Sequence, residues 1–159
     1  MEKAVQTSIL FFGTSEFAVP ALEALIRHGY TPVGAITNPD EPAGRKHVLT
    51  PPPIKVCAAR HNIPVWQPKK LNYESFIREA SAANLFIVAA YGKIIPQMIL
   101  DIPKYGALNI HPSLLPRWRG PSPIQHTILA GDPKTGITII KIDAKMDHGP
   151  IVAQSRIKN

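Results

Sequence analysis

Residues 8–37, SILFFGTSEFAVPALEALIRHGYTPVGAIT, decide the fold class of this 159-residue chain. The segment opens with an apolar run, residues 8–13, that ends in glycine and is typical of a buried strand. Apolar side chains then recur at helical spacing over residues 17–26, and Gly29 is expected to end that helix. A second apolar run follows at residues 33–37. This order predicts two strands joined by a helix, which is the building unit of a parallel sheet.

The rest of the chain continues the alternation of strands and helices. Further extended segments are predicted at residues 64–66, 85–90, 107–111, 136–142 and 151–155, and helices at residues 54–61, 73–82 and 123–130. Ser15 is expected to cap the first helix, and residues 38–53, which are rich in proline and glycine, are expected to form a long loop. Apolar strands that alternate with helices indicate an α/β fold with a doubly wound, mostly parallel, Rossmann-like sheet.

The composition indicates a globular protein with a basic surface. Eighteen Lys and Arg outnumber eleven Asp and Glu, and neither residues 42–73 nor residues 102–131 contain an acid. Such patches suit an anionic partner such as RNA, although a solvated basic surface without a partner is the alternative. No apolar run approaches the length of a membrane-spanning helix, and the N-terminus lacks the apolar stretch of a signal peptide. A cytoplasmic location is therefore expected.

Motifs of several common α/β enzymes are absent from the sequence. The turn after the first strand holds only Gly13 of the three glycines in a dinucleotide fingerprint, and neither a Walker A motif nor a G-x-S-x-G elbow occurs. Cys57 is the single cysteine, and the histidines lack partners at metal-ligand spacing. The sequence therefore predicts no nicotinamide or flavin cofactor, no serine nucleophile and no metal site.

The segment Asn109-Ile110-His111-Pro112 carries the clearest chemistry in the sequence. Residues two apart on a strand face the same side, so Asn109 and His111 are expected to project together where this fold binds ligands. An amide donor beside an imidazole suits stabilisation of an oxyanion and transfer of a proton. A carboxylate from the polar loop at residues 143–150 could orient the histidine. The alternative is that both side chains only satisfy backbone groups in the turn before the proline.

Longer segments around these residues resemble the signatures of the folate-dependent formyltransferases. Residues 109–124, NIHPSLLPRWRGPSPI, resemble the first signature of that family. Residues 131–149 contain the Gly-Asp, Thr-Gly and Asp-Ala-Lys-Met-Asp-His-Gly elements of the second. Residues 12–20, FGTSEFAVP, and residues 37–55 are similar to the branch of the family that acts on methionyl-tRNA. The resemblance covers nearly the whole chain.

The resemblance implies an enzyme of translation initiation that transfers a formyl group from 10-formyltetrahydrofolate to the α-amine of methionine on initiator tRNA. It implies that Asn109, His111 and Asp147 are catalytic and that no metal takes part. The folate is expected to lie against Ala89, Ala90, Tyr91, Gly92, Ser113, Leu114, Leu115, Pro116 and Asp143. The tRNA is expected to contact Arg45, Lys46 and Lys55.

The resemblance also bears on the extent of the chain and on other functions. Residues 1–159 would form the catalytic domain without its C-terminal part and without the C-terminal β-barrel of the family, and would act as a monomer. Glu41 and His148 depart from the family pattern, in which a basic residue and a threonine are usual. The alternatives are an amine acceptor such as a sugar nucleotide or glycinamide ribonucleotide, or a non-catalytic fragment that binds folate or RNA.

Overall fold

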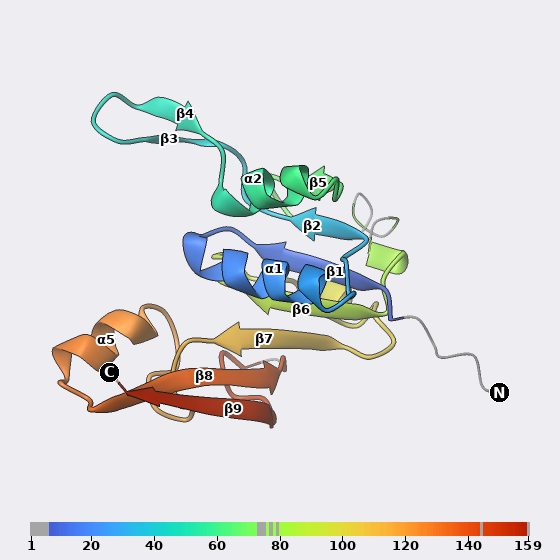
Figure 1. Cartoon of the computed structure of the whole chain (residues 1–159). Helices are drawn as coiled ribbons and strands as arrows, with labels where there is room; N and C mark the ends of the chain where they lie inside the picture. The colour runs from blue at the N-terminus through green and yellow to red at the C-terminus, as the bar shows by residue number, and fades with distance from the viewer. Residues whose placement is uncertain (1–6, 73–75, 77, 79, 144, 159) are drawn as a thin grey trace. The chain divides into compact units, whose positions relative to one another are not determined.

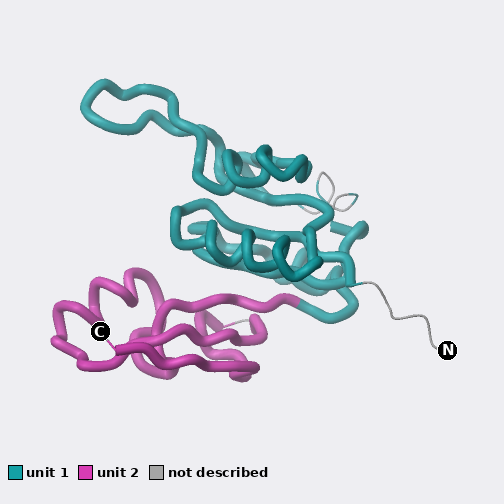
Figure 2. Tube along the Cα trace, viewed as in Figure 1, with its two compact units in different colours: residues 1–106 teal, residues 107–159 magenta. Residues whose placement is uncertain are grey.

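The computed structural model describes residues 7–72, 76, 78, 80–143 and 145–158. The chain divides into two compact units, residues 1–106 (unit 1) and residues 107–159 (unit 2), which Figure 2 colours separately. Figure 1 shows the strands and helices of each unit along the chain.

Unit 1 is built on four parallel strands among the described residues, in the order β5-β2-β1-β6. They are β1 (Ile9–Gly13), β2 (Gly34–Ile36), β5 (Val65–Trp66) and β6 (Leu85–Ala89). Every residue of β1 is buried, and the Phe12 ring packs against the rings of Phe86 and Tyr91 with centroids 5.1 and 5.5 Å away. Continuous apolar strands are typical of a parallel sheet, because both of its faces are covered.

The described helices of unit 1 are the 3₁₀ turn η1 (Glu16–Ala18), α1 (Val19–Arg27), α2 (Pro53–Arg60) and α4 (Gln97–Leu100). Ser15 lies at the N-cap position of η1, as predicted, but its side chain makes no capping hydrogen bond. Gly29 follows the end of α1 with a φ of +81°, as the sequence predicts. Five of the ten residues of the helix predicted over residues 73–82, namely 73–75, 77 and 79, lie outside the described ones. No described helix has the length and apolar character needed to cross a membrane.

The segment predicted as an irregular loop, residues 38–53, contains an antiparallel hairpin. Its strand β3 (Glu41–Ala43) pairs with β4 (Val48–Thr50), and Gly44 lies in the turn with a φ of +69°. Every residue of both strands is exposed, and Figure 1 shows the hairpin reaching well beyond the parallel strands of unit 1. Pro42 fits here because a two-stranded ribbon has only edge strands. The loop prediction is therefore wrong for these residues.

Unit 2 contains β7 (Ala107–His111), α5 (Pro123–Leu129), β8 (Lys134–Lys141) and β9 (Ile151–Lys158). β8 pairs antiparallel with both β7 and β9. Buried residues alternate with more exposed ones along β8, which is typical of an antiparallel strand. The predicted α/β class with a mostly parallel sheet is confirmed, and unit 2 supplies the antiparallel exception.

Candidate active site

Asn109, His111 and Asp147 meet in unit 2. Nδ2 of Asn109 donates a hydrogen bond to Oδ1 of Asp147 at 3.2 Å, and Nδ1 of His111 lies 3.6 Å from Oδ2 of the same carboxylate. The side chains of His111 and Asp147 are only 5% and 13% exposed. β7 supplies the first two residues, two positions apart and therefore on one side of the strand. The side chains converge as the sequence predicts, and their catalytic role stays a prediction.

Close backbone contacts shape the loop that carries Asp147. Asp147 has a φ of +49°, and its Oδ2 accepts a hydrogen bond from the backbone N–H of Gly120 at 2.9 Å. Gly149 is buried, and a Cβ there would lie 1.7 Å from the carbonyl oxygen of Lys141. Only glycine allows this approach of the loop to the end of β8. The loop thus holds the carboxylate beside His111.

The second ring nitrogen of His111 faces the backbone. Nε2 lies 2.8 Å from the carbonyl oxygen of Trp118. Because a carbonyl oxygen only accepts hydrogen bonds, this contact requires the hydrogen on Nε2. In the neutral ring, Nδ1 then presents its lone pair on the side of Asp147. A proton that reached Nδ1 would lie between the ring and the carboxylate, which suits the pair to proton transfer.

The turn after β7 contains four of the predicted folate contacts, Ser113 to Pro116. Oγ of Ser113 donates to the carbonyl oxygen of Arg117 at 2.7 Å, and the N–H of Leu115 donates to Oγ1 of Thr138 at 3.1 Å. The side chains of Ser113 and Leu115 are buried in unit 2, whereas Leu114 and Pro116 are more exposed. Direct contact with a ligand from this turn is therefore expected chiefly from Leu114 and Pro116.

Four other predicted folate contacts, Ala89 to Gly92, lie at the carboxyl end of β6 in unit 1. The carbonyl oxygen of Tyr91 accepts hydrogen bonds from Oγ1 of Thr14 at 2.9 Å and from Nδ2 of Asn38 at 3.2 Å. The carboxyl ends of β1, β2 and β6 are thereby tied together. The Tyr91 side chain is buried, and this burial raises the pKa of its phenol to about 12. Tyr91 therefore offers its backbone at this edge, because its neutral ring belongs to the core.

Asp143, the remaining predicted folate contact, lies in the loop after β8. Its Oδ1 accepts a hydrogen bond from the N–H of Lys145 at 2.9 Å, and its Oδ2 lies 3.9 Å from Nδ1 of His148. The carboxylate is 40% exposed. Within the part of the chain that the structure describes, no three His, Cys, Asp or Glu side chains are grouped to hold a metal ion.

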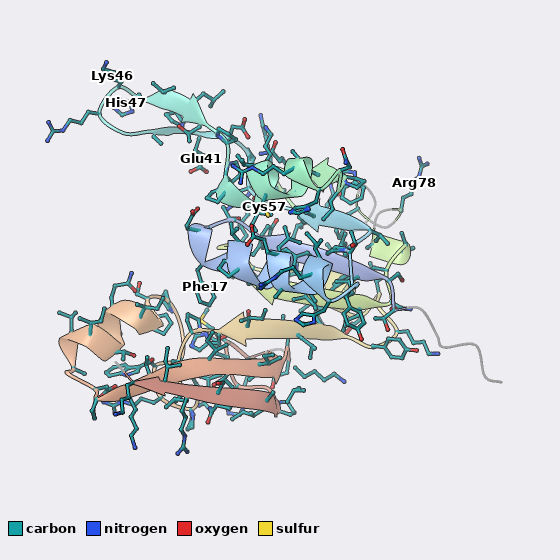
Figure 3. All side chains as sticks on the ribbon, in the orientation of Figure 1. Phe17, Glu41, Lys46, His47, Cys57 and Arg78 are labelled. Carbon is teal, nitrogen blue, oxygen red and sulfur yellow. The ribbon has the colours of Figure 1, made fainter. Side chains whose placement is uncertain are left out.

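The three predicted tRNA contacts lie on two different elements, the hairpin and α2. Arg45 and Lys46 are exposed in its turn, and Figure 3 shows Lys46 and His47 at its far end. Lys55 instead lies on α2, with Nζ 2.7 and 2.8 Å from the two carboxylate oxygens of Asp40. Lys55 therefore fastens the base of the hairpin to α2, and its charge is already paired.

The ion pair at the hairpin base has a second donor. Nε2 of Gln67 donates to Oδ1 of Asp40 at 2.7 Å and to the carbonyl oxygen of Asn38 at 2.8 Å. The hydrogen bonds from Gln67 and Lys55 lower the pKa of Asp40 below its ordinary value of 3.8. The carboxylate is therefore charged at neutral pH, and the interaction is lost only as the pH falls through that lowered pKa.

Comparisons with known proteins give the family of the chain. A donor amide, a histidine and a carboxylate joined at a strand end in an α/β fold define a class of site suited to acyl-type transfer. The family model described as formyl transferase matches residues 6–158, so the chain belongs to the formyl transferase family. This confirms the family predicted from the sequence.

Individual relatives narrow the comparison. The methionyl-tRNA formyltransferase of Bacillus subtilis strain 168 is 48% identical over 153 residues, which are 95% of this chain and 48% of the relative. That of Chloroflexus aurantiacus strain J-10-fl is 52% identical over 149 residues, covering 92% and 48%. The chain thus spans about half the length of these curated relatives. Glycinamide ribonucleotide transformylase 1 from Geobacillus kaustophilus matches with a TM-score of 0.72 and 26% identity, over 96% of this chain and 84% of that one.

Proposed function

We propose that this chain carries the formyl-transfer site of a methionyl-tRNA formyltransferase, with 10-formyltetrahydrofolate as donor and methionyl initiator tRNA as acceptor. The observation that carries the proposal is the contact of Asn109 and His111 with one carboxylate, Asp147. The identity of 48–52% to relatives of that name supports this acceptor over glycinamide ribonucleotide, since the solved transformylase is only 26% identical.

The chemistry begins when the neutral α-amine attacks the formyl carbon. A nitrogen–carbon bond forms and the formyl oxygen becomes an oxyanion. The amide of Asn109 has two N–H groups, and one of them donates to Asp147. The other is available to the oxyanion, and a donor held in place before the reaction stabilises that charge most effectively.

The second half of the reaction moves a proton and breaks a bond. The bond between the formyl carbon and N10 of the folate breaks, and N10 takes up the proton that the amine loses. His111 relays this proton through Nδ1, while Asp147 beside it stabilises the charged ring. Nε2 of His111 keeps its hydrogen bond to the Trp118 carbonyl oxygen throughout the reaction. Asn109, His111 and Asp147 thus act as the oxyanion donor, the proton relay and the carboxylate that stabilises the protonated ring.

The exposed cations of the hairpin turn, Arg45 and Lys46, are proposed to contact tRNA phosphates. Arg45→Ala is expected to weaken binding of methionyl-tRNA and to lower the slope of log affinity against log salt by about 1, because one phosphate contact is lost. Folate binding should not change. A salt titration of tRNA binding measures the slope. It is carried out on this chain and on a version extended at its C-terminus to the length of the curated relatives.

Lys55→Gln is the matched comparison for Arg45→Ala, because it also removes one positive charge. The Lys55 ammonium is paired with Asp40, so its loss should change the salt slope by clearly less than the loss of Arg45. Equal changes in slope would contradict the role of Lys55 as the anchor of the hairpin base.

A formyl-transfer assay tests the proposed function itself. 10-formyltetrahydrofolate is supplied with methionyl initiator tRNA, glycinamide ribonucleotide and an amino-sugar nucleotide in competition. Both this chain and the extended version are assayed. The proposal is supported if methionyl-tRNA is formylated and the other two acceptors are not. Preferential formylation of a small amine, or folate binding without transfer in both versions, would overturn it.

A further inference from the structure

Asp132, which has no role in the proposed mechanism, lies in the turn that ends α5. At the end of α5, the N–H of Gly131 donates to the carbonyl oxygen of Ile128 at 3.0 Å, and that of Asp132 donates to Thr127 at 3.1 Å. Gly131 has a φ of +62°. These two bonds and a left-handed glycine form a Schellman motif, which ends a helix in a fixed direction. The motif therefore fixes the position of the Asp132 backbone, from which the side chain extends.

The Asp132 carboxylate holds two successive side chains of the turn after β7. Nε and Nη2 of Arg117 donate to it at 2.8 and 2.7 Å, and the indole Nε1 of Trp118 donates to Oδ2 at 2.7 Å. The guanidinium also stacks over the Trp118 ring, 4.5 Å from the centroid. The bonds from Arg117 and Trp118 lower the pKa of Asp132, which keeps the carboxylate charged at neutral pH.

This anchoring bears on the backbone of Trp118. Trp118 has a φ of +58°, in the left-handed region that a bulky residue rarely adopts without outside support. In this conformation its carbonyl oxygen lies 2.8 Å from Nε2 of His111. The carbonyl oxygen of the preceding residue, Arg117, accepts the hydroxyl of buried Ser113. The side chains held by Asp132 thus belong to the residues whose carbonyls fix the end of β7.

We propose that Asp132 is a positioning residue for His111. By anchoring Trp118, it keeps a carbonyl acceptor on Nε2 and so selects the neutral tautomer whose Nδ1 lone pair faces Asp147. The importance of this tautomer for catalysis rests on the proposed function. The tautomer itself is a property of unit 2 and can be measured without substrate.

Nuclear magnetic resonance of this chain tests the proposal directly. Long-range ¹H–¹⁵N spectra of ¹⁵N-histidine protein distinguish the two neutral tautomers, and a His111→Gln variant assigns the signal among the six histidines. Wild-type His111 should carry its hydrogen on Nε2 at a pH where the ring is neutral. Asp132→Ala should shift the signal to a mixture of tautomers. Asp132→Asn, which keeps an oxygen for the indole N–H, should restore the wild-type signal.

Two further variants separate anchoring from general loss of structure. Trp118→Phe removes the indole N–H but keeps a ring, so it should shift the tautomer as Asp132→Ala does even if the latter fails to fold. Arg117→Ala leaves the bond between Trp118 and Asp132 in place and should leave the tautomer unchanged. An unaltered Nε2–H tautomer in folded Asp132→Ala or in Trp118→Phe would overturn the proposal.

Formyl transfer by the extended version supplies the second readout. Asp132→Ala should lower kcat by about 10-fold or more with the KM for folate within about two-fold, and Asp132→Asn should recover most of that loss. If the tautomer shifts as expected but the wild type transfers no formyl group, the proposed function fails and the positioning role stands. If transfer is normal in the wild type and the tautomer does not respond to Asp132, the positioning role alone fails.

Discussion

Asn109→Ala should slow formyl transfer by about 10²-fold or more while the affinity for folate changes by no more than a few-fold. The substitution removes the N–H proposed for the oxyanion and the 3.2 Å bond to Asp147. Both losses weigh on the transition state more than on the bound donor. Single-turnover kinetics of the C-terminally extended version give the rate, and a fluorescence titration with folate gives the affinity.

The exposed Asn62→Ala is the matched control for this substitution. Asn62 lies in the turn after α2, outside the proposed site, so its replacement should leave the rate within about two-fold. Asn109 is only partly buried, so Asn109→Ala should lower the free energy of unfolding by no more than about 1–2 kcal/mol. Near-normal turnover would show that Asn109 is not the oxyanion donor. A failure to fold would favour its alternative role in satisfying the turn before Pro112.

Gly149→Ala should lower both the stability of the protein and its rate of formyl transfer. The added Cβ would meet the carbonyl oxygen of Lys141 at 1.7 Å and the carbonyl carbon at 2.9 Å. Lys141 is paired with Leu108 of β7 and cannot easily move away, so the loop that carries Asp147 must shift instead. A cost of about 1–3 kcal/mol in the free energy of unfolding is expected, as for other overpacked sites. Chemical denaturation followed by circular dichroism measures it.

Gly29→Ala is the control for the strain of replacing a glycine. Gly29 has a φ of +81° and nothing within 4 Å of an added Cβ, so the cost should be about 1 kcal/mol from the backbone alone. Its rate of formyl transfer should equal that of the wild type. Unchanged stability and rate in Gly149→Ala would contradict the proposal that this contact sets the position of Asp147.

The sequence predicts the buried strands best. The runs at β1 and β6 are apolar throughout, and β7 is found at the predicted residues 107–111, because burial leaves a strong pattern. The hairpin of β3 and β4 is missed because its residues are all exposed, and Pro42 argues against a strand. Nothing in an exposed two-stranded ribbon selects for an apolar pattern, so periodicity cannot reveal it.

The candidate active site, too, is only partly predictable from the sequence. Spacing on one strand predicts that Asn109 and His111 share a side, and the family resemblance adds Asp147. The contacts that hold these residues come from the backbone of Gly120 and Trp118, and backbone groups leave no trace in residue type. The ion pair between Asp40 and Lys55, which the resemblance assigns as a tRNA contact, could not be predicted either, because sequence spacing does not show which charged side chains meet.

The exposed hairpin is a part of this protein in which amino-acid substitutions should be well tolerated. Its base is fastened through Asp40, but its turn, residues 44–47, touches solvent rather than the core. Mutations there change surface charge without opening a cavity or breaking a buried bond, and so cost little stability. Substitutions in the turn, by natural variation or by directed evolution, can therefore change the charge of the hairpin while the contacts around Asn109 stay unchanged. Glu41, an exposed acid at the start of an otherwise basic hairpin, is another position where the charge can change at little cost in stability.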